Sequence, residues 1–291
     1  MHINRIPLAY TKLIKSYLEN RKFYVRINKA NSGERTEVPQ GSTLGPVLYT
    51  IFTSDIPTQK KTITAMYADD AAILTASRRI DTITYNLQTH IKEIENWLQN
   101  WRIKVNAETS AAIIFTQKKF RHNPDRSIQL NNIRIPWGDE VNYLGVTMDT
   151  KLNFNKHIQN NKKKAYGIKS YLYPLLNKNS KLDVTTKINK YKSIRPTFTY
   201  AAEVWIQASR TQLRQLQILQ NKTLRQCLDA PYYITNTYTK IPKIPTIEEH
   251  INKIATRTYE KMEHHPNKTI RDAINYDKNQ MKRRKRSRNV L

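Results

Sequence analysis

The tetrapeptide Tyr-Ala-Asp-Asp at residues 67–70 lies between two apolar runs, 62–66 and 71–76, each as long as a short strand. Two such runs joined by a few polar residues predict a β-hairpin whose turn carries both aspartates. A turn interrupts the strict alternation of sides along a strand, so neighbouring carboxylates can be aimed at one point. Hard divalent cations prefer carboxylate oxygens. The stretch therefore predicts a hairpin that presents a candidate metal-binding pair.

A second cluster of turn-forming residues lies upstream, at residues 38–46, with the order Val-Pro-Gln-Gly-Ser-Thr-Leu-Gly-Pro. Pro46 suits the first turn of a helix, which we expect to run to about Asp55. Gly41 has no Cβ, so a substrate could approach the backbone closely at that point. The segment is therefore a candidate loop beside a substrate, and ordinary turn chemistry before a helix is the less favoured explanation of Gly41, Gly45 and Pro46.

The remaining pattern indicates an α+β chain. Apolar residues step by three and four from Ile80 to Trp101, which predicts a long amphipathic helix with one buried stripe. Beyond residue 153 the pattern is nearly all helical, and a β-containing half followed by a helical half predicts two lobes. The other elements that we predict are a helix at 7–20, a strand at 23–27, a strand at 111–116, and a hairpin of 133–136 with 141–148 that turns at 137–140.

The charge balance favours a nucleic-acid partner. The chain has 50 Lys and Arg residues against 23 Asp and Glu residues, a formal net charge of +27. After residue 120 lie 33 of the basic and 13 of the acidic residues. An excess of this size, together with 17 tyrosines and 4 tryptophans, is typical of phosphate contacts combined with base stacking. A bias towards solubility is the simpler alternative, whereas no basic amphipathic helix points to a membrane surface.

The single cysteine, Cys227, excludes a disulfide within the chain and a cysteine-based zinc site. No apolar run approaches the length of a transmembrane helix. The first ten residues do not have the pattern of a secretory signal. We therefore expect an intracellular protein. The run 282–288 has six basic residues in seven, which predicts a disordered tail that serves nuclear import or nucleic-acid contact.

Taken together, the two loops resemble the most diagnostic motifs of reverse transcriptases, and further stretches resemble the polymerases of jockey-like non-LTR retrotransposons. The resemblance covers about residues 8–250 and is carried by residues 38–46, 67–70, 101–106, 143–146, 195–196, 199–202, 205, 220–222, 224–225 and 230–231. It implies an RNA-directed DNA polymerase that joins nucleotides with two metal ions, Mg²⁺ or Mn²⁺. Its implied partners are an RNA template, a DNA primer, their hybrid and deoxynucleoside triphosphates, with no membrane.

The resemblance also implies roles for individual residues. Asp69 would be a metal ligand shared by both ions and Asp70 the supporting carboxylate. The residues that would border the nucleotide and the primer terminus are Gln40, Gly41, Tyr67 and Ala68, and those at a primer grip are Tyr143, Leu144 and Gly145. The implied domains are a partial palm at 1–120, a primer-grip hairpin region at 121–150, a helical thumb at 151–260 and a basic, disordered tail at 261–291.

The chain departs from the family at two places. The family has a lysine after the long helix, proposed to protonate the leaving pyrophosphate, where this sequence has Thr109. The family also has a metal-binding aspartate on a strand before the 38–46 loop, whereas residues 1–54 contain no aspartate. We therefore expect an N-terminal polymerase segment, with the first catalytic strand and the fingers, to be missing from this chain. We expect no primer extension by the isolated chain with Mg²⁺.

Two other interpretations stay open. A catalytically inactive nucleic-acid-binding remnant of such an element would keep the same motifs and the same basic charge. A group II intron maturase shares both diagnostic loops, but the stretch around Arg195, Pro196 and Tyr200 favours the retrotransposon.

Overall fold

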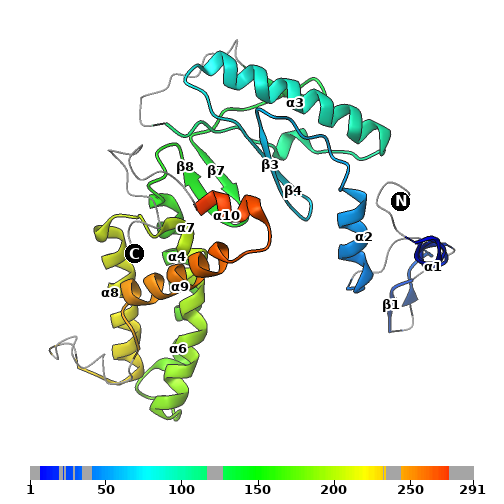
Figure 1. Cartoon of the computed structure of the whole chain (residues 1–291). Coiled ribbons are helices and arrows are strands. Elements are labelled where there is room, and N and C mark those ends of the chain that lie inside the picture. Colours follow the sequence, from blue (N-terminus) through cyan, green and yellow to red (C-terminus); the bar gives the residue numbers. More distant parts are fainter. Residues whose placement is uncertain are drawn as a thin grey trace. The chain divides into compact units, whose positions relative to one another are not determined.

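The computed structural model in Figure 1 describes residues 7–19, 22, 24–28, 30–34, 41–116, 127–231, 233 and 244–274. The chain divides into two compact units. Unit 1 comprises Met1–Ser110 and Pro124–Ile135, and unit 2 comprises Ala111–Asn123 and Pro136–Leu291. Helices combine with two-stranded antiparallel sheets in the described residues, so the predicted α+β class is confirmed.

Unit 1 is organised around the long helix α3. Its elements in chain order are α1 (Leu8–Leu18), β1 (Arg26–Ile27), β2 (Ala30–Asn31), α2 (Leu44–Phe52), β3 (Ile63–Tyr67), β4 (Asp70–Leu74), α3 (Ile80–Asn100), the 3-10 helix η2 (Ala107–Thr109), β5 (Ile128–Leu130) and β6 (Ile133–Ile135). Strands β1 and β2, β3 and β4, and β5 and β6 pair as hairpins. The predicted helices at 7–20, 46–55 and 80–101 are therefore confirmed to within a few residues.

Helix α3 buries one stripe, as its apolar spacing predicts. Ile91 and Leu98 are buried, and the side chain of Gln88 holds the neighbouring strand β5. The Gln88 amide donates to the carbonyl of Gln129 at 3.0 Å, while the Gln129 amide donates to Gln88 Oε1 at 2.8 Å. By contrast, no residue of α1 or α2 is buried. These two helices therefore keep apolar side chains on the surface of unit 1.

Unit 2 is a hairpin followed by a helical bundle. Its elements are β7 (Glu140–Tyr143), β8 (Val146–Asp149), α4 (Asn155–Tyr171), α5 (Tyr173–Leu176), α6 (Val184–Thr199), α7 (Ala202–Trp205), α8 (Arg210–Cys227), α9 (Ile247–Glu263) and α10 (Lys268–Ile274). Helices α4, α6 and α8 contact one another, and α9 packs on α7 and α8 (Figure 1). The shared core contains the fully buried side chains of Tyr191, Trp205 and Leu216. Among the described helices, none is both long and apolar enough to cross a membrane.

The predicted pairing between 133 and 148 is wrong. Ile133–Ile135 pairs with Ile128–Leu130, while Glu140–Tyr143 pairs with Val146–Asp149, so there are two hairpins instead of one. Each has a two-residue turn with left-handed backbone: Asn131 and Asn132 in the first, with φ of 51° and 62°, and Leu144 and Gly145 in the second. Turns of this type match the twist of the flanking strands. The chain therefore reverses at these two dipeptides and not at residues 137–140, where composition predicted the turn.

The predicted strand at 111–116 is also wrong. Ala112 makes only an isolated bridge to Trp137, and the other residues of this run are not in a strand. The apolar run is nevertheless held by single backbone hydrogen bonds within unit 2. The amide of Ala112 donates to the Pro136 carbonyl at 3.0 Å, and the amide of Thr116 donates to the Thr150 carbonyl at 2.9 Å. The apolar run 111–116 is therefore partly exposed and bonded to the segment around the β7–β8 hairpin without forming a strand of its own.

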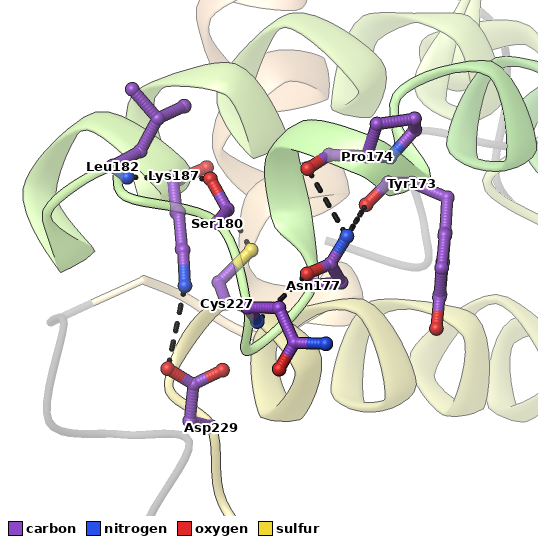
Figure 2. Close-up of polar contacts among 9 residues, drawn as sticks. Tyr173, Pro174, Asn177, Ser180, Leu182, Lys187, Cys227 and Asp229 are labelled. Atoms are coloured by element: carbon purple, nitrogen blue, oxygen red, sulfur yellow. Dashed lines mark hydrogen bonds and ion pairs between the residues drawn. The ribbon is translucent and has the colours of Figure 1, made fainter.

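Figure 2 shows the corner of unit 2 where α5 and α6 meet the end of α8. Lys187 is only 2% exposed, and its ammonium group lies 3.3 Å from an Asp229 carboxylate oxygen, which compensates the charge that α6 buries. The thiol of Cys227 donates to the Lys187 carbonyl at 3.7 Å. Burial raises the pKa of Cys227 to about 11. Cys227 is therefore a core residue whose thiol stays protonated at neutral pH.

Candidate active site

The aspartate pair lies at the turn of the β3–β4 hairpin, as the sequence predicts. Tyr67 pairs with Asp70, so Ala68 and Asp69 form the two-residue turn. Ala68 has a φ of 51°, in the left-handed region that residues with a Cβ seldom adopt. All four residues of the tetrapeptide are exposed. The structure thus presents two adjacent carboxylates at an open hairpin tip.

The loop before α2 is fixed by a serine. Ser42 Oγ accepts a hydrogen bond from the Gly45 amide at 3.1 Å, which caps the start of the helix. The same oxygen accepts a hydrogen bond from the Tyr17 hydroxyl of α1 at 2.8 Å. Gly41 precedes it with a φ of 82°, which only glycine adopts readily. Gln40 lies outside the described residues, so its predicted place beside Gly41 stays a prediction.

Helix α2 joins this loop to the aspartate turn. The Tyr49 hydroxyl donates a 2.6 Å hydrogen bond to the carbonyl oxygen of Ala68. Gly41 and the aspartate pair are therefore linked through one short helix of unit 1. Reasoning from sequence did not identify Tyr49. The one available signal is that Tyr49 is the only tyrosine in a largely apolar helix (residues 44–52), where Thr50 is the other hydroxyl residue.

Helix α3 supports the strand that leads into the turn. Thr62, just before β3, donates its hydroxyl proton to His90 Nδ1 at 2.7 Å, and His90 Nε2 lies 2.9 Å from the Pro57 carbonyl. Because a carbonyl only accepts, Nε2 carries the proton and Nδ1 accepts from Thr62. His90 is fully buried. It thus ties α3 to both ends of the segment before β3.

The donor set fits part of a divalent-metal site. Asp69 and Asp70 offer carboxylate oxygens, which hard cations such as Mg²⁺ prefer. Within the described residues, no group of three or more His, Cys, Asp or Glu side chains could hold a metal ion. Among the described residues, the pair can therefore supply only part of a coordination shell.

Thr109, at the position where the resemblance implies a lysine, is the last residue of η2. Its hydroxyl donates to the carbonyl of Asn106 at 3.1 Å, and the Asn106 side chain accepts from the Glu108 amide at 3.0 Å. The threonine hydroxyl is therefore used in a hydrogen bond to a backbone carbonyl of its own turn. A local hydrogen bond of this kind is the usual use of threonine at the end of a helical turn.

The second predicted site, at Tyr143, Leu144 and Gly145, is the turn of the β7–β8 hairpin. Leu144 and Gly145 have φ values of 48° and 76°. The Tyr200 hydroxyl donates to the Leu144 carbonyl at 2.9 Å, and a Cβ added to Gly145 would lie 3.3 Å from Tyr200 Cε1. Glycine is therefore favoured at residue 145 for two reasons. Its backbone is left-handed, and Tyr200 leaves little room for a Cβ.

The buried side chains of Trp205 and His157 support Tyr200 and strand β8 beside this turn. Trp205 Nε1 donates to the Tyr200 carbonyl at 2.8 Å. The amide of Thr147, on β8, donates to His157 Nδ1 at 3.3 Å, and the rings of His157 and Trp205 lie 6.0 Å apart. Burial lowers the pKa of His157, so its Nδ1 stays free to accept this bond at neutral pH. Sequence reasoning missed His157.

We expect Gly145→Ala to destabilise the chain. An alanine with left-handed backbone costs about 1–2 kcal/mol, and its Cβ would also press on Tyr200. Urea denaturation followed by circular dichroism measures the change. Gly167→Ala is the matched control, because Gly167 lies in α4 with open space around it, so alanine there should stabilise by about 0.5–1 kcal/mol. Equal effects of the two changes would contradict this account of the turn.

The two turns belong to different units: residues 67–70 lie in unit 1 and Tyr143–Gly145 in unit 2. Within unit 1 the structure brings Gly41, α2 and the aspartate turn into one connected set. Within unit 2 it brings the β7–β8 turn against Tyr200. The meeting of both turns at one primer terminus stays a prediction.

Comparison with known proteins connects both turns to one family. The model of the family "Reverse transcriptase (RNA-dependent DNA polymerase)" matches residues 2–148. The RNA-directed DNA polymerase from mobile element jockey of Drosophila melanogaster is 34% identical over 272 residues, which cover 89% of this chain and 29% of the relative. The probable RNA-directed DNA polymerases from transposons BS and X-element of the same species are each 31% identical, covering 89% and 93% of this chain and 30% of each relative.

The chain thus spans about three-tenths of the length of the curated relatives that it matches. No solved structure matches it. The family match covers the Gly41 loop, the aspartate turn and the β7–β8 turn, and the similarity to the jockey polymerases extends across most of the helical unit. The chain therefore belongs to the reverse transcriptase family, and its similarity is to the polymerases of jockey-like non-LTR retrotransposons.

Proposed function

We propose that this chain forms part of an RNA-directed DNA polymerase and contributes Asp69 and Asp70 to its metal-binding site. The observation that carries the proposal is the turn itself. Two adjacent, exposed carboxylates lie at the tip of β3–β4, and a hydrogen bond from α2 connects that tip to the loop after Gly41. Nucleotidyl transfer needs carboxylates gathered where primer and nucleotide meet.

In the proposed reaction Asp69 and Asp70 hold Mg²⁺ or Mn²⁺, which would stabilise the charge that develops on the attacking and leaving oxygens. Gln40 and Gly41 line the floor under the incoming nucleotide, and Tyr67 and Ala68 border the primer terminus. The hydrogen bonds of Tyr17 and Tyr49 keep the loop and the turn in place before substrate arrives. Preorganised groups of this kind lower the barrier because they need no rearrangement during the reaction.

The proposed organisation follows the family. Residues 1–120 would be part of a palm, 121–150 would include the primer grip with Tyr143, Leu144 and Gly145, and 151–260 would be a helical thumb. The basic run 282–288 suits nuclear import and lies outside the described residues, whereas Lys268–Ile274, within the predicted tail, forms helix α10. The exposed apolar side chains of α1 and α2 suit a palm that packs against further polymerase sequence, which would also bring the remaining carboxylate.

The proposed nucleic-acid partner is supported by two helices of unit 2. Helices α4 and α8 contact each other and carry nine basic side chains and no carboxylate between them. Lys162 Nζ donates to Gln215 Oε1 at 3.1 Å across this contact. Burial, and then the positive charge of Lys222, lowers the pKa of Lys169. A phosphate backbone beside these lysines would relieve that repulsion, so we propose that α4 and α8 hold the RNA template, the DNA primer or their hybrid.

A chimeric polymerase tests the proposed activity directly. In the jockey polymerase of Drosophila melanogaster, the matching 272-residue stretch would be replaced by that of this chain. The expected result is extension of a DNA primer on an RNA template with Mg²⁺ and deoxynucleoside triphosphates, and its loss when Asp69→Asn is introduced. Template–primer affinity, measured in parallel, reports whether the chimera still folds and binds.

The proposal fails if the chimera binds template–primer as tightly as the jockey polymerase but extends no primer. That outcome would instead identify the chain as an inactive nucleic-acid-binding remnant. Extension that survives Asp69→Asn would also contradict the proposal, because the carboxylate pair could then not be the metal site.

A further inference from the structure

We propose that Tyr49 is a positioning residue, which sets the conformation of the aspartate turn through the carbonyl of Ala68. The inference rests on the proposed function, because it concerns the same carboxylate pair. Tyr49 touches neither metal nor nucleotide in this account. It acts through one 2.6 Å hydrogen bond from its hydroxyl to the backbone of the turn.

The bonded atom is well placed to control Asp69. The carbonyl of Ala68 belongs to the peptide group that joins Ala68 to Asp69, and a peptide group is planar. A hydrogen bond to its oxygen therefore limits rotation of the whole plane, including the nitrogen that is bonded to the Cα of Asp69. The left-handed φ of Ala68 makes this restraint useful, because alanine prefers other conformations and a free turn would move towards them.

The hairpin itself offers the turn little packing. Residues 65–71 are all exposed, and the last cross-strand pair before the turn is Tyr67 with Asp70. A two-stranded hairpin is only marginally stable by itself in water. The hydrogen bond from Tyr49, which lies outside the hairpin, therefore contributes much of the restraint on the conformation of the turn.

Helix α2 has a side-chain contact at each end, which restrains Tyr49 although no residue of the helix is buried. At its start, Ser42 caps the helix and accepts from Tyr17 of α1. At its end, the rings of Phe52 and Trp101 pack edge to face with centroids 4.8 Å apart. A shift of the loop at Gly41, where the proposed nucleotide floor lies, would therefore reach the aspartate turn through Tyr49.

The first test removes only the hydroxyl group. Tyr49→Phe keeps the ring, and Tyr85→Phe, at a tyrosine of α3 that is 68% exposed, is the control. Nuclear magnetic resonance of the full chain, isotope-labelled at alanine and aspartate, reports relaxation and hydrogen exchange at the amides of Ala68, Asp69 and Asp70. We expect faster exchange and greater mobility there in Tyr49→Phe alone. Amides that behave as in the unchanged chain would overturn the proposal.

The second test adds Mn²⁺, which broadens the signals of nearby amides. Tyr49→Phe should raise the Mn²⁺ concentration for half-maximal broadening at the turn about three- to tenfold, the range for one neutral hydrogen bond. Asp69→Asn should remove the broadening. Loss in Asp69→Asn with no change in Tyr49→Phe would overturn the positioning role and leave the metal site standing. Broadening at no turn amide would overturn the metal site, while the exchange measurement still decides the role of Tyr49.

Discussion

Replacing Asp69 with asparagine should weaken Mn²⁺ binding at the β3–β4 turn by at least about a hundredfold. Even groups that only orient a metal ligand contribute about 10–100-fold to affinity, and Asp69 is proposed to bind the metal directly. Asparagine keeps the size of the side chain and its place in the turn but removes the charge. Asp70→Asn should have a smaller effect, because Asp70 is assigned the supporting role. Isothermal titration calorimetry with the full chain measures both changes.

The matched control is Asp81→Asn. Asp81 is an exposed aspartate in the first turn of α3 and lies 3.9 Å from Arg79. Its substitution changes the net charge by the same amount but leaves the turn untouched, so Mn²⁺ affinity should stay the same. If Asp81→Asn weakened binding as much as Asp69→Asn, the metal would be responding to the overall charge of the chain and not to a site at the turn.

The parts of the fold that sequence predicts well are those set by local pattern. The apolar stripe from Ile80 onwards can only be buried by a helix, and α3 buries it at Ile91 and Leu98. The two apolar runs around the aspartates could pair only through a short turn, and β3 and β4 do so. In both cases one periodicity within one segment decides the structure.

The errors lie where several turns compete. Between 128 and 149, turn-forming residues occur at 131–132, 137–140 and 144–145, and composition alone does not rank them. The two hairpins close at Asn131-Asn132 and at Leu144-Gly145. The position of the second turn is favoured by a tertiary contact. Tyr200, far along the chain, covers Gly145 and donates a hydrogen bond to the Leu144 carbonyl.

The residues of the candidate site also fall into two groups, those that the local sequence identifies and those that it does not. Asp69 and Asp70 could be identified from the motif, since their chemistry lies in adjacent residues. Tyr49 and His90 could not, because their roles arise from hydrogen bonds to Ala68, to Thr62 and to Pro57, which only the fold brings near. Supporting residues of this kind have no spacing rule relative to the groups that they hold.

Binding of nucleic acid by the full chain should fall steeply with salt. With about six phosphate contacts, affinity for an oligo(dT)–poly(rA) hybrid should drop on the order of a thousandfold between about 50 and about 200 mM salt, because each neutralised phosphate releases counterions. Helices α4 and α8, which have nine basic side chains and no carboxylate of their own, are the expected location. Fluorescence anisotropy at several salt concentrations measures the slope of log affinity against log salt concentration.

A charge-removing variant locates the contacts. Lys163, Lys164 and Lys222 are exposed on α4 and α8, and changing all three to glutamine should reduce the salt slope by about one unit for each lost phosphate contact. The control changes three exposed lysines of unit 1, Lys12, Lys61 and Lys92, to glutamine and removes the same charge. Its slope should stay close to that of the unchanged chain, because phosphate contacts are local whereas a general charge effect is not. Equal reductions in both triple variants would mean that the whole basic surface binds and that α4 and α8 form no distinct site.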